Sequence, residues 1–168
     1  MSSDLQRQLD TATAFFLAGE RCALELKLGR YGFHTVSAPT ITNYALAVEL
    51  ALKLINLLSR DTAETGHNLE ALYFRLPADV RQNLMHLSEH VAEIARYFVD
   101  WRYPFEKDLL LGDYENPRRA FIECYREIKR LRPQLASVYE NLWGGFDPEW
   151  IQSWLTEQPR WELRLVGR

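Results

Sequence analysis

One arginine and one histidine in the middle of the chain have the types and the spacing for acid–base chemistry on a phosphate. Arg81 and His86 lie five positions apart, near the start of a predicted helix. Five steps turn about 140° net around a helix, so the side chains diverge, although long arms can still line one groove. An arginine can neutralise a phosphate, and a histidine can move a proton near neutral pH. Arg81 and His86 are therefore candidate catalytic residues for metal-independent RNA cleavage. Two solvated side chains are the simpler alternative.

Other chemical constellations are weak or missing in the sequence. His86 and His90 are four positions apart and could share a helix face, but no third metal ligand of suitable spacing accompanies them. There is no Gly-rich phosphate loop, no Gly-x-Ser-x-Gly elbow and no cysteine pair with zinc spacing. We therefore expect no metal and no cofactor. Metal-dependent hydrolases and serine or cysteine hydrolases lose most of their support.

The composition describes one ordinary globular domain over residues 1–168. The chain is 47% hydrophobic and 26% charged, and its net charge of −3 argues against a broad cationic face. Cys22 and Cys124 are far apart and suit buried thiols in a reducing compartment. The first residues lack an apolar run behind a basic flank, and no stretch approaches 18 consecutive apolar residues. We expect a cytoplasmic protein that binds no membrane.

Helical spacing of apolar residues dominates the chain, and no useful stretch alternates with period two. The pattern predicts an all-α, up-and-down bundle of four principal helices plus two short ones. The segment 30–38 is predicted to be a loop, and Pro133 predicts a kink or a split in the fifth helix. The predicted helices cover 4–28, 40–59, 69–76, 78–101, 116–142 and 148–157.

The helix predicted over 40–59 is apolar around most of its circumference, so we expect it at the centre of the bundle. Glu49, Lys53 and Asn56 form one polar stripe along it, because they are three or four positions apart. Glu49 precedes Lys53 by four positions, which is the favourable order for an ion pair on a helix surface.

Three strings resemble one family when they are taken in order. They are Ala47-Val-Glu49-Leu-Ala-Leu-Lys53, then Gly66-His67-Asn68-Leu69, then Arg96-Tyr-Phe-Val-Asp-Trp-Arg102-Tyr103-Pro104-Phe-Glu106. Their order and spacing resemble HEPN (higher-eukaryote and prokaryote nucleotide-binding) domains, which are α-helical bundles. The resemblance covers about 40–107 and does not cover 116–168. It implies four candidate binding residues, Glu49, Lys53, His67 and Arg102.

Each of these residues also has a structural explanation. Glu49 and Lys53 suit a surface ion pair worth a few tenths of a kcal/mol. His67 suits a contact with backbone groups at the start of a helix. Arg102 suits a packing anchor, with its guanidinium stacked on a neighbouring aromatic ring.

The resemblance implies two kinds of function. Many HEPN proteins are ribonucleases of toxin–antitoxin or other defence systems, and they act as homodimers in which each subunit supplies an Arg and a His to a composite site. Others lack that pair and serve as binding or dimerising modules, often beside a nucleotidyltransferase. Arg81 with His86 matches the spacing, and so does Arg60 with His67. The family's catalytic motif often continues His-x-Tyr, whereas here Leu87 and Ser88 follow His86.

We therefore expect a HEPN-like binding and dimerising component of a toxin–antitoxin or defence module. Its expected partners are a second copy of the chain and a nucleotidyltransferase or antitoxin. The alternative is a metal-independent endoribonuclease, with RNA as its partner, that uses Arg81 and His86 across a homodimer. A third class is a small-molecule bundle with a pocket lined by Tyr44, Tyr73, Phe74 and Phe98.

An aromatic C-terminal extension at about 143–168 stands apart from the rest of the chain. Four of the five tryptophans lie there, namely Trp143, Trp150, Trp154 and Trp161. Tryptophans are enriched at interface hot spots. This segment is expected either to form part of a homodimer interface or to fold back onto its own bundle.

Overall fold

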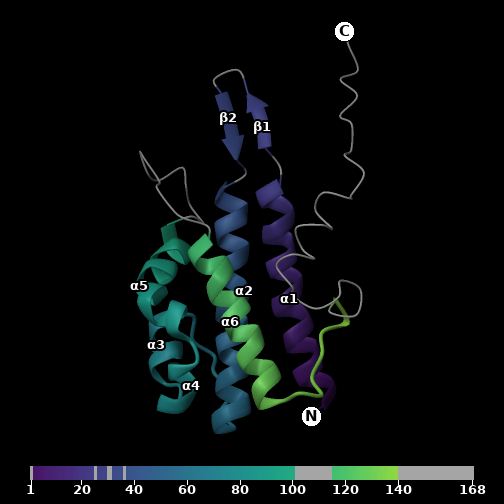
Figure 1. Ribbon diagram of the computed structural model, residues 1–168, viewed down its shortest axis with the longest axis vertical. Helices are drawn as coiled ribbons and strands as arrows, with labels where there is room; N and C mark the ends of the chain where they lie inside the picture. Colours follow the sequence, from purple (N-terminus) through teal and green to yellow (C-terminus); the bar gives the residue numbers. More distant parts are fainter. Residues whose placement is uncertain (1, 25, 30–31, 36, 101–114, 140–168) are drawn as a thin grey trace.

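The computed structural model describes residues 2–24, 26–29, 32–35, 37–100 and 115–139. Within these ranges the fold is all-α, with six helices that pack against each other and one short hairpin (Figure 1). The predicted all-α fold of packed helices is confirmed for this part of the chain, but only one of the two predicted short helices, 69–76, is among the six, because the other, 148–157, lies outside the described residues. The elements are α1 Ser2–Leu24, β1 Leu26–Gly29, β2 Gly32–Thr35, α2 Ser37–Arg60, α3 Leu69–Phe74, α4 Ala78–Gln82, α5 Met85–Asp100 and α6 Glu115–Leu131.

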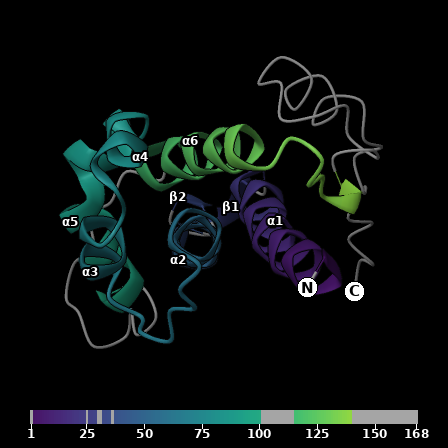
Figure 2. The same ribbon diagram turned by 90° about the horizontal axis from the view of Figure 1, so that it is seen from below.

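Helix α2 is the centre of the bundle, as its apolar circumference predicts. It contacts α1, α3, α5 and α6, and the view along the bundle shows α2 enclosed between them (Figure 2). Phe16 of α1 and Phe121 of α6 complete the core, with their rings stacked 4.5 Å apart between centroids. The polar stripe of α2 must therefore face a neighbouring element and not open solvent, since so little of its circumference is exposed.

The single helix predicted over 78–101 is divided into α4 and α5. Asn83 closes α4, and α5 begins two residues later, at Met85. Glu123 of α6 accepts hydrogen bonds from the backbone N–H groups of His86 and Leu87, both at 3.1 Å. A carboxylate from another helix thus satisfies donors that the first turn of α5 would otherwise leave unpaired. This tertiary contact stabilises a second helix start that local sequence does not indicate.

The predicted first helix to residue 28 and the predicted loop over 30–38 are both wrong in part. Helix α1 ends at Leu24, and β1 pairs antiparallel with β2, in a register from Leu26 opposite Thr35 to Gly29 opposite Gly32. Each strand has only four residues, which is too short for a period-two pattern to stand out. Gly29 and Gly32 form the last pair of this ladder.

Helix α6 ends at Leu131 and residues 132–137 are not helical, so the predicted helix over 116–142 is interrupted there; residues 138 and 139 are helical again, and 140–142 lie outside the described residues. Pro133 follows Leu131 by two residues, and a proline disfavours helical backbone at the residue before it. The prediction of a break at Pro133 is therefore confirmed. The predicted helix 148–157, the aromatic segment 143–168 and Arg102 lie outside the described residues.

One helix of the described residues, α2, is long and apolar enough to cross a membrane. Most of that stretch is buried inside the bundle, and the core helix of a soluble protein has the same length and composition. Glu49 and Asn56 interrupt it and contact His67 and Leu72 of the following segment, whereas Lys53 pairs with Glu49 within α2. Its apolarity is therefore explained by its central position in the core.

Candidate functional site

Three of the four candidate binding residues meet at one point between α2 and the loop that follows it. Glu49 is buried, with 1% of its surface exposed. Its Oε1 accepts a hydrogen bond from Lys53 Nζ at 2.7 Å and lies 2.9 Å from His67 Nδ1. The imidazole of His67 is 73% exposed, whereas Lys53 is largely covered. We call this group the Glu49 cluster.

The Glu49 cluster is only half satisfied. Both partners share Oε1, and the second oxygen, Oε2, is buried with no hydrogen-bond partner among the described residues. A buried charged oxygen without a partner is costly and is found more often at functional sites than in a core built only for stability. The cluster thus combines a buried anion with an imidazole that reaches solvent.

The loop before α3 presents His67 without using it as a cap. Asp61 follows α2 with a positive φ of 53°, which turns the chain away from the helix axis. Asn68 is the N-cap of α3, and its Oδ1 accepts a hydrogen bond from the Ala71 backbone N–H at 2.9 Å. The alternative in which His67 serves the helix start is therefore wrong, because Asn68 makes that contact and His67 contacts Glu49.

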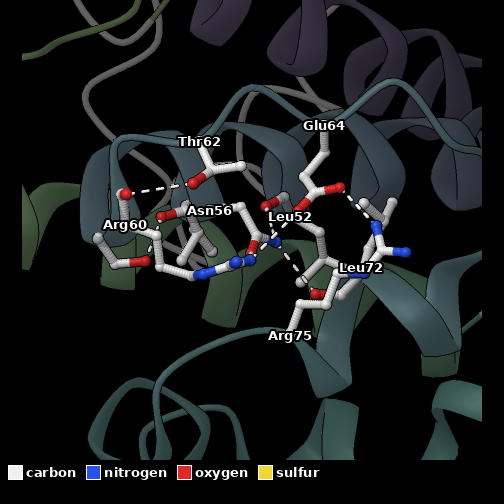
Figure 3. A network of polar contacts seen from close by, with 9 residues as sticks. Leu52, Asn56, Arg60, Thr62, Glu64, Leu72 and Arg75 are labelled. Atoms are coloured by element: carbon white, nitrogen blue, oxygen red, sulfur yellow. Dashed lines mark hydrogen bonds and ion pairs between the residues drawn. The ribbon is translucent and has the colours of Figure 1, made fainter.

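Asn56, the third member of the polar stripe, ties α2 to α3. It is fully buried, and its Nδ2 donates to the backbone carbonyls of Leu52 and Leu72, both at 3.0 Å (Figure 3). Its Oδ1 accepts from Arg60 Nη1 at 3.0 Å. Both functional atoms of the amide are thus paired, so its role is structural.

Glu64 extends this network across the loop. Its carboxylate accepts from Arg60 at 3.2 Å and from Arg75 at 2.5 Å (Figure 3). The loop is therefore tied to the end of α2 and to the residue that closes α3. The guanidinium of Arg60 already bonds Asn56 and Glu64, so Arg60 and His67 do not form a free catalytic pair.

Arg81 lines an open groove of about 570 Å³ between α3, α4 and α5. Its Nε is buried and has no hydrogen-bond partner among the described residues. Phe74 and Met85 also line this groove and are 60% and 68% exposed. Of the four residues expected to line an aromatic pocket, Tyr73 and Phe74 line this groove, Tyr44 is fully buried elsewhere, and the side chain of Phe98 lies outside the described residues. The groove lining is Tyr73, Phe74, Ala78, Arg81, Gln82, Met85, Ser88 and Glu89.

His86 lies away from this groove. Its Nε2 is 3.2 Å from the backbone carbonyl oxygen of Asn116, at the start of α6, and its ring is 4.5 Å from that of His90. The structure therefore does not bring Arg81 and His86 into one groove of a single chain, in keeping with the angle between them on a helix. His90 contacts Glu93 at 3.3 Å. Among the described residues, no group of three metal-ligating side chains occurs.

A second buried carboxylate was not indicated by the sequence. Glu20 of α1 accepts from the Tyr44 hydroxyl at 2.7 Å and from Arg118 Nε at 2.6 Å, and its other oxygen accepts from Arg118 Nη2 at 3.3 Å. Burial and the charge of Glu20 raise the pKa of the Tyr44 hydroxyl. Burial opposes the charge on Arg118, but Glu20 outweighs it and raises the pKa of that guanidinium. Glu20 and Arg118 are 98 residues apart, so no local pattern could pair them.

No family model, curated protein or solved structure matches the chain. Any function must therefore be inferred from the residues of this chain and their geometry. Two places in the described residues stand out, the Glu49 cluster and the groove around Arg81.

Proposed function

We propose that this chain is a HEPN-like binding and dimerising component of a toxin–antitoxin or defence module. The observation that carries the proposal is the groove between α3, α4 and α5. It exposes two large apolar side chains, Phe74 and Met85, beside an arginine whose Nε lacks a partner. Adjacent exposed apolar residues next to an unsatisfied charged group are typical of an interaction surface. The ordered HEPN-like strings supply the family expectation.

The partner that this groove fits best is a second copy of the chain. Arg81 and Glu89 both line it, so the surface carries one charge of each sign. In a two-fold interface, residue i of one copy meets residue j of the other, and j meets i. Arg81 would then pair with Glu89 of the partner subunit twice, while Phe74 and Met85 become buried between the copies. A nucleotidyltransferase or antitoxin would bind the dimer elsewhere.

A charge exchange tests the dimer. We expect Arg81→Glu and Glu89→Arg each to weaken self-association by at least about tenfold, since each places like charges together. The double variant should restore it, because the exchanged charges attract again. Sedimentation equilibrium measures the dissociation constant, and Arg126→Glu, on the exposed face of α6, is the matched control. A wild-type monomer at high micromolar concentration, or no rescue by the double variant, would contradict the proposal.

An endoribonuclease is the second candidate, favoured by one observation. The Nε of Arg81 has no hydrogen-bond partner among the described residues, as expected for an arginine that is positioned to bind a phosphate. Against it, His86 contacts the Asn116 carbonyl outside the groove. RNA incubated with the protein and EDTA should stay intact. Cleavage that disappears in His86→Ala would make the ribonuclease the correct function.

A further inference from the structure

We propose that His67 is a phosphoryl-acceptor site, in which Nε2 takes a phosphoryl group from a donor of the phosphoramidate class while Glu49 holds Nδ1. The site is separate from the groove around Arg81 and does not depend on dimerisation. Glu49 is a positioning residue here, and His67 is the residue that reacts. Three features of the Glu49 cluster carry the inference: the tautomer, the buried charge and the open approach.

The tautomer follows from the contact between the two side chains. A carboxylate ion-paired to Lys53 has no proton to donate, so the 2.9 Å contact requires Nδ1 of His67 to carry the hydrogen. In the neutral imidazole the lone pair then lies on Nε2. The same contact fixes the orientation of the ring, and a carboxylate on the far nitrogen makes the free nitrogen a better electron donor. Glu49 thus prepares His67 to react at one atom.

The buried charge favours the product. A ring that carries a phosphoryl group on Nε2 and a hydrogen on Nδ1 is positively charged. The negative charge of Glu49 lies 2.9 Å from the Nδ1 that keeps its hydrogen and so favours the positively charged ring, while solvent around the exposed imidazole and the ammonium of Lys53 reduce this effect. Glu49 Oε2 makes no hydrogen bond that would disperse this charge further. Lys53 shares Oε1 and keeps the carboxylate in place.

The approach to Nε2 is open. The imidazole is largely exposed, and a Cβ added at the adjacent Gly66 would meet no atom within 4 Å. His86 and His90 differ, since their rings pack against each other and each ring has a further polar contact. A small anionic donor can therefore reach His67 more easily than either of them.

The transfer step balances without any redox partner. The donor in its neutral-pH form carries an ammonium nitrogen bonded to phosphorus. The lone pair of Nε2 attacks phosphorus, the phosphorus–nitrogen bond breaks, and ammonia leaves with the hydrogens that it already bears. The ring keeps its Nδ1 hydrogen, which stays bonded to Glu49. No additional proton acceptor is needed.

The test treats the full chain with potassium phosphoramidate and follows the product by phosphorus NMR and by mass spectrometry of peptides. We expect one phosphoryl group on His67, attached at Nε2, formed at least about tenfold faster than on His86 or His90. Attachment at Nδ1, or similar rates at the three histidines, would overturn the proposal. This readout needs no variant, so it does not depend on how a substitution affects folding.

Two variants separate positioning from simple exposure. Glu49→Gln should slow the reaction of His67 by about tenfold or more and allow attachment at Nδ1, because the charge that favours one nitrogen is gone. Glu64→Gln is the matched control, since Glu64 is also largely buried near the same loop but bonds Arg60 and Arg75. Circular dichroism checks that both variants fold. An unchanged rate and attachment site in folded Glu49→Gln would refute the role of Glu49.

Discussion

Two buried carboxylates of this bundle, Glu20 and Glu49, differ in how completely they are paired. Glu20 is 4% exposed, and both of its oxygens accept hydrogen bonds, from Tyr44 and Arg118. Glu49 is buried to a similar degree, but both of its partners share one oxygen and the other oxygen has none. Burial alone therefore does not distinguish a structural carboxylate from a functional candidate. What distinguishes them is whether each carboxylate oxygen has a hydrogen-bond partner.

The surroundings of the two groups differ in the same way. Glu20 joins three helices, since its partners come from α2 and α6, and close packing protects it. At Gly19 an added Cβ would lie 2.5 Å from the Tyr44 ring, so only glycine allows this ring to approach α1. Glu49 instead contacts the imidazole of His67, which is exposed to solvent. We expect the first site to determine stability and the second to determine chemistry.

The largest effect should come from breaking the Glu20 site. Arg118→Ala leaves the carboxylate of Glu20 buried with only the Tyr44 hydroxyl as a partner, and loss of one member of a buried pair costs about 3–5 kcal/mol. Urea denaturation measures the change in the free energy of unfolding. Arg119→Ala is the matched control, because the side chain of Arg119, next to Arg118 in the sequence, is exposed and its Nε lies 3.9 Å from Glu115 Oε2. A loss below about 1 kcal/mol for Arg118→Ala would show that this site is not structural.

A smaller effect should appear in alkaline solution. The folded protein holds the Tyr44 proton more tightly than the unfolded chain does, since burial and Glu20 raise the pKa of its hydroxyl. Above the ordinary tyrosine pKa of about 10, the unfolded state releases a proton that the folded state keeps. The free energy of unfolding should then fall by about 1.4 kcal/mol per pH unit from this group.

Comparison of wild type with Tyr44→Phe isolates the contribution of Tyr44 to the pH dependence of the free energy of unfolding. The variant loses one hydrogen bond to Glu20, so it should be less stable at neutral pH, by about 1 kcal/mol. Its stability should then decline less steeply above about pH 10. Denaturation curves over this range measure both quantities. Parallel declines in the two proteins would contradict the raised pKa of Tyr44.

The smallest effect should come from His67→Ala in the Glu49 cluster. The imidazole is exposed and Lys53 still pairs with Glu49, so the free energy of unfolding should fall by less than about 1 kcal/mol. Urea denaturation of His67→Ala and of Arg118→Ala under the same conditions compares the two losses in the free energy of unfolding directly. A loss as large as that of Arg118→Ala would mean that His67 is part of the structural framework.

Local features of the sequence predicted most of the helical framework. Apolar spacing predicts the central position of α2, and the spacing of Glu49 and Lys53 predicts their ion pair, although Glu49 is buried and the pair does not lie at the surface as expected. Pro133 predicts the end of α6. These features are encoded within a few residues of each other, so the chain pattern reveals them directly. The resemblance to HEPN domains and the function that it implies stay predictions.

Contacts between distant segments determined the remainder, because their free energy depends on groups that meet only after folding. Glu123 of α6 caps α5 and so divides a helix that the local pattern reads as continuous. Glu20 and Arg118 pair across most of the chain, and His67 meets Glu49 eighteen residues before it. Residue types and short spacings therefore name the candidate groups, whereas burial and the pairing of each oxygen decide which of them can react.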